Sequence, residues 1–179
     1  IHQKFAEIRG LDFSKVRTKG GDLDTNELSA ILRDDGGDVP HKIASGIVDA
    51  AGDEQALLFT CDVAQAYQTQ DIIRRIGKKA VAMDGTWDKD KRKGVLDAYR
   101  RKEFQFLVNC ALFTEGWDEP CVAVVGIARP TKSRQLYTQM VGRGLRPYNG
   151  LDGWKIDDHG GGDGSHGRKL AIESSEKPR

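Results

Sequence analysis

Two arginines three positions apart are the residues best suited to chemistry in this sequence. They lie in the segment Gln139-Met140-Val141-Gly142-Arg143-Gly144-Leu145-Arg146-Pro147. On a helical turn this spacing points both guanidinium groups the same way, and an arginine can bind phosphate oxygens in bidentate fashion. The alternative for Arg143 and Arg146 is a solvated basic helix end that the helix dipole favours. Gly142 and Gly144 count against that alternative, because a structural helix end needs only one glycine.

The second candidate is the loop Thr114-Glu115-Gly116-Trp117-Asp118-Glu119-Pro120, which soon follows an apolar run. Gly116 permits a turn or a close approach that a Cβ atom would block. The carboxylate of Asp118 could accept hydrogen bonds from a ribose hydroxyl. Taken alone, the loop favours the simpler interpretation, in which it merely joins a strand to a helix and Asp118 caps or is solvated.

Basic residues gather in two parts of a chain whose net charge is only +1. Any nucleic-acid contact must therefore come from local patches. Such patches suit a phosphate backbone, although a lysine-rich helix face is also common on soluble surfaces. The first part runs from 129 to 146 without an acidic residue, and the second is a short cluster; their members are Arg129, Lys132, Arg134, Arg143 and Arg146, and Lys89, Lys91, Arg92 and Lys93.

Short apolar runs alternate with helical patterns in the middle of the chain, and these elements must position the candidate residues. This alternation predicts a parallel sheet with helices on both faces. Ligands collect at the carboxyl ends of such strands, so the important loops follow Thr60, Met83, Cys110 and Ala128. The predicted strands are 56–60, 79–83, 105–110 and 121–128, and the predicted helices run from Asp62 to Gly77, from Asp88 past Tyr99, and from Ser133 to Val141.

The two ends of the chain differ in composition from its middle. Residues 1–54 are polar and read as a lead-in with two short helices, the first capped by Thr25 and the second opened by Pro40. Residues 151–179 read as a glycine-rich, partly disordered tail. The chain begins at Ile1 rather than Met, which we interpret as a fragment of a longer protein.

Cysteine usage indicates a reducing compartment. The three cysteines are Cys61, Cys110 and Cys121, an odd number without a C-x-x-C pair. A disulfide framework is therefore not expected, and the cytoplasm is the predicted location. No apolar run approaches the roughly 20 residues of a membrane span.

In order and spacing, these segments resemble the second, C-terminal RecA-like domain of superfamily 2 helicases of the DEAD/DEAH-box type. Residues 57–60 are similar to motif IV, and 83–85 followed by Arg92 to the motif after it. Residues 109–120 are similar to motif V and 139–146 to motif VI, with its Q-x-x-G-R-x-x-R form. The resemblance implies a three-layer α/β sandwich with a parallel sheet, related to the P-loop NTPases, over residues 55–150.

The resemblance also implies roles for single residues. Gly116 and Asp118 of motif V and Gln139 of motif VI would bind the nucleotide, with Asp118 at the ribose. Arg143 and Arg146 would be catalytic arginine fingers that reach ATP phosphates on a partner domain. The positions that would line the nucleic-acid backbone are Thr60, Gly85 and Cys110.

What the sequence lacks defines the expected partner. It has no G-x-x-x-x-G-K-[ST] loop and no Asp-Glu-x-[His/Asp] motif, which hold the phosphates and the magnesium ion. In this family both belong to an N-terminal RecA-like domain, so ATP and Mg²⁺ would be bound mainly there and this chain alone would not hydrolyse ATP. Cys110-Ala111 and Gln139-Met140 depart from the usual DEAD-box pairs, and the motif style is closer to phage and restriction-type DNA helicases. DNA is therefore the expected nucleic acid rather than RNA.

Three alternatives remain beside this interpretation. A stand-alone Rossmann-like nucleotide-binding module would need a glycine-rich loop after its first strand, and Thr60-Cys61-Asp62-Val63 offers none. A nucleic-acid-binding module without ATP coupling would need a stacking platform, and only 7% of the residues are aromatic. A metal site in the tail, between Asp157 and His166, would lack the close spacing and the thiolates of most structural zinc sites.

Overall fold

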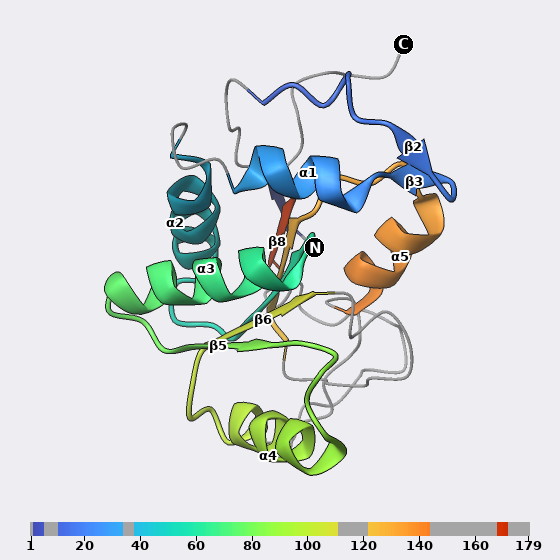
Figure 1. Ribbon diagram of the computed structural model, residues 1–179. Helices are drawn as coiled ribbons and strands as arrows, with labels where there is room; N and C mark the ends of the chain where they lie inside the picture. The colour runs from blue at the N-terminus through green and yellow to red at the C-terminus, as the bar shows by residue number, and fades with distance from the viewer. Residues whose placement is uncertain (1, 6–10, 34–37, 111–121, 144–167, 172–179) are drawn as a thin grey trace, which may run out of the picture.

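The computed structural model describes residues 2–5, 11–33, 38–110, 122–143 and 168–171. Figure 1 shows their arrangement. No helix in these ranges is both long and apolar enough to cross a bilayer. The elements, in chain order, are β1 (His2–Phe5), β2 (Thr18–Lys19), β3 (Asp22–Leu23), α1 (Thr25–Leu32), α2 (Val39–Ala51), β4 (Ala56–Thr60), α3 (Val63–Arg75), β5 (Ala80–Met83), α4 (Lys89–Arg100), β6 (Phe106–Cys110), β7 (Val124–Ala128), α5 (Arg134–Arg143) and β8 (Arg168–Ala171).

A parallel sheet forms the centre of the fold, with the strand order β1-β8-β7-β4-β6-β5. The four strands predicted from apolar runs are confirmed as β4, β5, β6 and β7. Every residue of β4 and β7 is buried, as expected of strands that are covered on both faces. β1 and β8 extend this sheet on the β7 side, and neither was predicted from the sequence.

Alternate residues of the strands face two different helix layers. Leu58 and Val108 pack in one hydrophobic cluster with residues of α1, α2 and α3. Leu57 and Leu107 point to the other face and pack with residues of α4 and α5. Figure 1 shows α4 on the opposite side of the sheet from α2 and α3. The predicted three-layer α/β sandwich is therefore confirmed.

Carboxylates begin two of the predicted helices, as expected. The Asp62 side chain accepts a hydrogen bond from the Gln65 N–H at 2.7 Å at the start of α3. Asp88 accepts one from the Lys91 N–H at 2.8 Å at the start of α4. Both bonds satisfy donors that have no partner within the helix. Gly77 follows Ile76, the C-cap of α3, and has a φ of +91°, which is the left-handed turn predicted for the end of this helix.

The cap predicted for the first helix is wrong by one residue. Asp24 caps α1, and its carboxylate accepts hydrogen bonds from the N–H groups of Asn26 at 3.0 Å and Glu27 at 3.1 Å. Thr25 is instead the first residue of the helix. An aspartate is at least as good a cap as a threonine, and the residue before Thr25 supplies one.

Helices α1 and α2, in the predicted lead-in, belong to the main hydrophobic core. Leu28, Leu32, Ile43 and Ile47 each have 0% of their surface exposed and lie in the same cluster as Leu58. The boundary predicted at residue 54 is therefore not a break in this core. Likewise, β8 places four residues of the predicted tail in the sheet.

A small hairpin precedes α1 and was not predicted. β2 and β3 pair antiparallel, with Thr18 opposite Leu23 and Lys19 opposite Asp22. Gly20 and Gly21 connect them with φ angles of +61° and +86°. Two consecutive positive φ angles are typical of the tight hairpin turn that matches the strand twist. The hairpin directs the side chain of Asp22 toward the segment after β7.

Candidate functional site

The carboxyl ends of the central strands are level with one another. Thr60 of β4 is the register partner of Cys110 on β6 and of Ala128 on β7. Met83 of β5 is opposite Asn109 of β6. The segments that follow all four strands therefore leave from one edge of the sheet, which is where α/β proteins bind their ligands.

Thr60, at the carboxyl end of β4, is buried rather than exposed at this edge. Only 1% of the residue is exposed. Its hydroxyl is 3.0 Å from the carbonyl oxygen of Asn109 and 3.2 Å from that of Asp62. Its predicted contact with a nucleic-acid backbone stays a prediction, and it would require the hydroxyl to exchange a carbonyl partner for a phosphate.

Two cysteine thiols lie next to Thr60. The Cys110 thiol donates to the carbonyl oxygen of Cys61 at 3.4 Å. Burial raises the pKa of Cys61 to about 12, and burial also raises the pKa of Cys110. Both groups are therefore protonated thiols at neutral pH, which are poor nucleophiles and poor metal ligands. Neither Cys61 nor Cys110 therefore supplies a thiolate at this edge at neutral pH.

A buried carboxylate shapes the loop after β5. Asp84 accepts hydrogen bonds from the Tyr67 hydroxyl at 2.8 Å and from the N–H and hydroxyl of Thr86 at 2.8 and 2.5 Å. The bond from the Thr86 hydroxyl is the largest cause that lowers the pKa of Asp84, and the other two bonds add to it. Gly85, a predicted nucleic-acid contact, is exposed at the turn that this carboxylate holds.

Arg92 holds the same loop from the other side. Its Nε and Nη2 atoms donate to the carbonyl oxygen of Trp87 at 3.2 and 2.7 Å, and Nη2 lies 3.4 Å from the carbonyl oxygen of Gly85. The Nζ atom of Lys91 lies 3.8 Å from the Trp87 ring centroid. Arg92 is therefore turned toward the loop, whereas Lys89 and the other lysines of the predicted cluster are exposed.

The side chain of Asp22, which was not predicted as a site residue, binds the segment after β7. Asp22 of the β2–β3 hairpin accepts hydrogen bonds from the Thr131 hydroxyl at 2.9 Å and the Lys132 N–H at 2.8 Å, and lies 3.4 Å from Nη2 of Arg129. Burial acts to raise the pKa of Asp22, but hydrogen bonds from Leu23, Lys132 and Thr131 lower it overall. The predicted basic tract thus begins at a partly buried ion pair.

Helix α5 carries two of the predicted nucleotide-binding residues. Gln139 is half-buried, and Arg143 is the last residue of the helix. The side chain of Arg143 is outside the described part of the structure, as are Arg146, Gly116 and Asp118. Their predicted contacts with a nucleotide stay predictions. Cys121 and the candidate metal ligands of the tail also lie outside the described residues.

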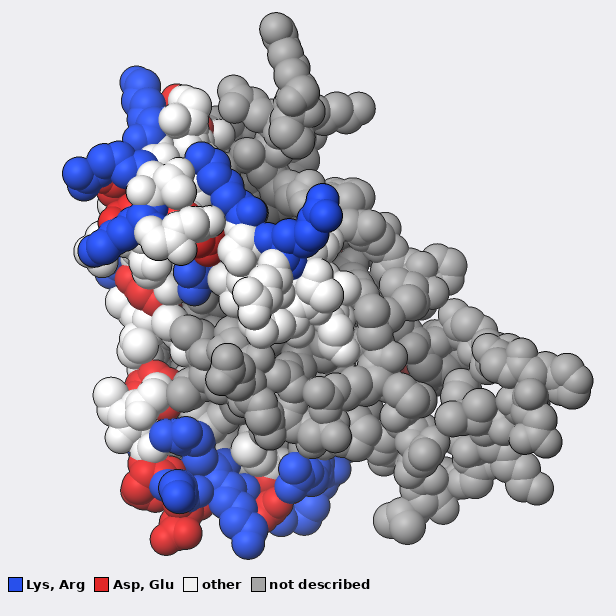
Figure 2. Space-filling model, turned by 90° about the vertical axis from the view of Figure 1, so that its right-hand side faces the viewer, with Lys and Arg blue, Asp and Glu red and all other residues white. Residues whose placement is uncertain are grey.

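Lys and Arg side chains gather at two places on the face shown in Figure 2. The upper group lies over the β2–β3 hairpin and the start of α5, and the lower group lies over α4. α5 follows β7 and α4 follows β5, so each group includes a segment that leaves the carboxyl edge of the sheet. Their exposed members are Arg17, Lys19, Lys132 and Arg134 in the first and Lys89, Lys91, Lys93, Arg100 and Arg101 in the second.

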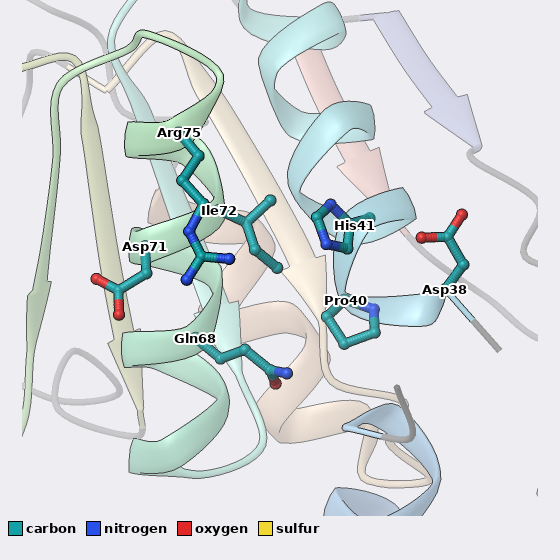
Figure 3. Close-up of a pocket in the computed structure, with 7 residues that line it drawn as sticks. All are labelled: Asp38, Pro40, His41, Gln68, Asp71, Ile72 and Arg75. Atoms are coloured by element: carbon teal, nitrogen blue, oxygen red, sulfur yellow. The ribbon is translucent and has the colours of Figure 1, made fainter. Parts of the chain in front are cut away.

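A separate pocket of about 350 Å³ lies between α2 and α3. Figure 3 shows Gln68 and Arg75 of α3 extending toward Pro40 and His41 of α2, while Asp71 points away from them. None of the predicted site residues lines this pocket. Its lining mixes acidic and basic groups, and it does not share the carboxyl edge that the strand register defines.

Comparison with known proteins gives a consistent result. Residues 40–147 match the family model of the helicase conserved C-terminal domain. The chain is 32% identical over 105 residues to IRC3 of Saccharomyces cerevisiae, which is provisionally named an ATP-dependent helicase; the match covers 59% of this chain and 15% of that protein. The chain spans less than a third of the length of the curated relatives it matches.

Solved structures show the same fold. The yeast DEAD-box splicing factor Prp28 superposes with a TM-score of 0.60 at 17% identity, over 76% of this chain and 27% of that chain. Saccharomyces cerevisiae Dbp5, solved bound to RNA and ADP BeF3, gives a TM-score of 0.58 at 13% identity over 76% and 32% of the two chains. The chain therefore belongs to the helicase conserved C-terminal domain family and has the fold of the second RecA-like domain of superfamily 2 helicases.

Proposed function

We propose that this domain is the second motor domain of an ATP-dependent nucleic-acid helicase or translocase. The observation that carries the proposal is the common edge on which β4, β5, β6 and β7 end. From this edge α5 leaves toward the predicted nucleotide, and the loop after β5 leaves toward the predicted nucleic acid. One edge can thus link two ligands, as a motor requires.

At the nucleotide, α5 would complete an active site that is mostly built elsewhere. Gln139 and Arg143 are four residues apart on α5, so they lie on the same helix face. In the proposed mechanism, Arg143 and Arg146 reach ATP and Mg²⁺ on a first RecA-like domain and stabilise charge on the transferred phosphoryl group. Asp118 and Gly116 would then lie at the ribose.

At the nucleic acid, the contacts would be to phosphates rather than to bases. Gly85 presents an exposed backbone at a turn that Asp84 and Arg92 hold in place. The exposed lysines of α4 add positive charge beside it. Dbp5, which has the same fold, was solved with RNA, whereas the style of motifs V and VI favours DNA for this chain.

Opening and closing of the cleft between the two domains would turn ATP hydrolysis into movement along the strand. The two domains each hold the nucleic acid, and closure on ATP brings the two contacts together. The arginines would report the state of the nucleotide to this domain. Hydrolysis would release them and let the domain move.

The test is substitution of Arg143 in the protein that contains both motor domains. Arg143→Ala should lower nucleic-acid-stimulated kcat by a factor on the order of 10³ to 10⁵, as for arginine fingers in other phosphoryl-transfer enzymes. Arg143→Lys should not restore it, since an ammonium group lacks the bidentate geometry. Arg75→Ala is the matched control, because Arg75 is exposed, belongs to neither basic group, and is the last residue of α3, whose first turn is the end that leaves this edge. Wild-type turnover in Arg143→Ala would refute the proposed role.

This chain by itself should bind single-stranded DNA weakly and hydrolyse no ATP. The weak binding is expected because only one of the two domains that hold the strand is present. Its affinity should fall steeply with salt, since phosphate contacts release counterions. Salt-independent binding, or ATP turnover that follows the chain through several columns, would contradict this expectation.

A further inference from the structure

The β2–β3 hairpin lies outside the part of the chain that the family model matches, which begins at residue 40. It nevertheless contacts the segment that starts α5. We propose that Asp22 of this hairpin is a positioning residue for α5 and therefore for Arg143 at its end. The role of Arg143 rests on the proposed function, whereas the positioning of α5 does not.

A continuous path of hydrogen bonds joins Asp22 to the first turn of α5. Oδ1 of Asp22 accepts from the Thr131 hydroxyl at 2.9 Å and from the Lys132 N–H at 2.8 Å. Oγ1 of Thr131 in turn accepts from the Ser133 N–H at 3.0 Å. The Ser133 hydroxyl accepts from the Leu136 N–H at 3.2 Å. Every link in this path sets the direction in which the helix begins.

The second carboxylate oxygen of Asp22 and the hairpin itself reinforce the contact. Oδ2 lies 3.4 Å from Nη2 of Arg129, and both side chains have only 15% of their surface exposed. Nζ of Lys132 donates to the Thr18 hydroxyl at 3.3 Å. The hairpin therefore contacts the segment before α5 at both Arg129 and Lys132, and these two contacts restrict rotation of that segment.

The geometry of α5 makes its start important for its end. The helix has ten residues, so at about 1.5 Å per residue it is about 15 Å long. A tilt of about 5° at the first turn would move the last turn by about 1 Å, and a displacement of that size can reduce catalysis about 100-fold. A residue that fixes the first turn can thus control how Arg143 meets a phosphate.

Hydrogen exchange in this chain tests the positioning without ATP or nucleic acid. Asp22→Ala removes both oxygens, and the amides of Leu136 and Tyr137 should exchange about tenfold faster. Asp22→Asn keeps an Oδ1 acceptor but loses the ion pair, so its effect should be smaller. Asp12→Ala is the control, because Asp12 is exposed and its hydrogen bonds within the described residues are local ones to Ser14, and it should match the wild type.

The outcomes separate this inference from the proposed function. Unchanged exchange at Leu136 and Tyr137 in Asp22→Ala, with normal protection of β4 and β6, would overturn the positioning of α5. If Asp22→Ala unfolds the whole chain, the same comparison is made on Thr131→Val, which removes the hydroxyl that links Asp22 to the Ser133 N–H. If Arg143→Ala keeps wild-type turnover, the proposed role of Arg143 fails, but the expected hydrogen exchange of Asp22→Ala stays the same.

Kinetics in the two-domain protein test whether the positioning matters for catalysis. Asp22→Ala should lower kcat about tenfold or more while the KM for ATP changes less than about twofold, since a misplaced arginine affects the transition state more than the ground state. Asp12→Ala should keep both parameters. A wild-type kcat in Asp22→Ala, in a protein in which Arg143→Ala is inactive, would refute the link between the hairpin and the arginine.

Discussion

Replacement of Asp62 by alanine should cost about twice as much stability as replacement of Asp88, although both cap helices. Asp62 caps α3 through the Gln65 N–H, and it also accepts a hydrogen bond from the Ser29 hydroxyl and pairs with Arg33 at 3.5 Å. Ser29 lies in α1, and Arg33 is the C-cap of the same helix. Asp62 therefore joins two helices, whereas the Asp88 side chain bonds only within its own helix in the described part of the chain.

The magnitude follows from the three contacts. The cap contributes about 1 kcal/mol, and the partly buried hydrogen bond from Ser29 about another 1 kcal/mol. The pair with Arg33 adds only about 0.3 kcal/mol, because the two side chains are 41% and 27% exposed and water screens them. Asp62→Ala should thus lose about 2 kcal/mol of unfolding free energy, against about 1 kcal/mol for Asp88→Ala.

Urea unfolding followed by circular dichroism measures this difference. Asp62→Asn should lie within about 0.5 kcal/mol of the wild type, since asparagine caps as well as aspartate and can still accept from Ser29. The dependence of unfolding free energy on urea should stay the same in all three variants. Equal losses in Asp62→Ala and Asp88→Ala would refute the reasoning, because the contact with α1 would then contribute nothing.

Three further predictions concern the core and the candidate edge. Burial raises the pKa of Cys61 to about 12, whereas the thiol of an unfolded chain titrates at about 8.5. The stability that the neutral thiol contributes is therefore complete below about pH 8.5 and is lost as the pH rises toward 12. Cys61→Ala should make the fall in unfolding free energy above about pH 9 less steep, as urea unfolding at several pH values would measure. Gly126→Ala should cost about 1–3 kcal/mol in thermal or urea unfolding, because the added Cβ would lie 2.6 Å from Cδ1 of Leu58; no loss would show that the core yields there. Arg92→Ala should weaken binding of single-stranded DNA more than Lys89→Ala, although both remove one positive charge, because Arg92 also holds the Gly85 loop; equal titration curves would contradict this.

The sequence predicts the central fold well because its strands are buried on both faces. Residues 56–60 and 124–128 are continuous apolar runs, the pattern of strands covered by helices. β1 reads His-Gln-Lys-Phe and β8 reads Arg-Lys-Leu-Ala, so neither carries that pattern. Their place in the sheet depends on pairing between distant parts of the chain, which no local pattern contains.

The candidate site could be predicted only in part, for a similar reason. Thr60, Gly85 and Cys110 were predicted from the order of the motifs, and the structure places them at or just after strand ends that lie level. Their contact with nucleic acid stays a prediction. Asp22 was missed because its partners, beginning at Arg129, are more than a hundred positions away. Its signal was the Gly20-Gly21 pair, which indicates a hairpin turn but not what the hairpin contacts.

The strand order sets the sequence in which the sheet can be assembled during synthesis. In the described part of the chain, β1 pairs with β8, and β8 pairs with β7. β1 leaves the ribosome before β8 and must wait for it, while β4, β5, β6 and β7 can already join. Until residues 168–171 emerge, the free side of β7 presents unpaired N–H and C=O groups, which other chains can use as a template. Closure of this side is a contact between distant residues and thus a slow, late step, so a nascent chain stalled before it would be prone to aggregate.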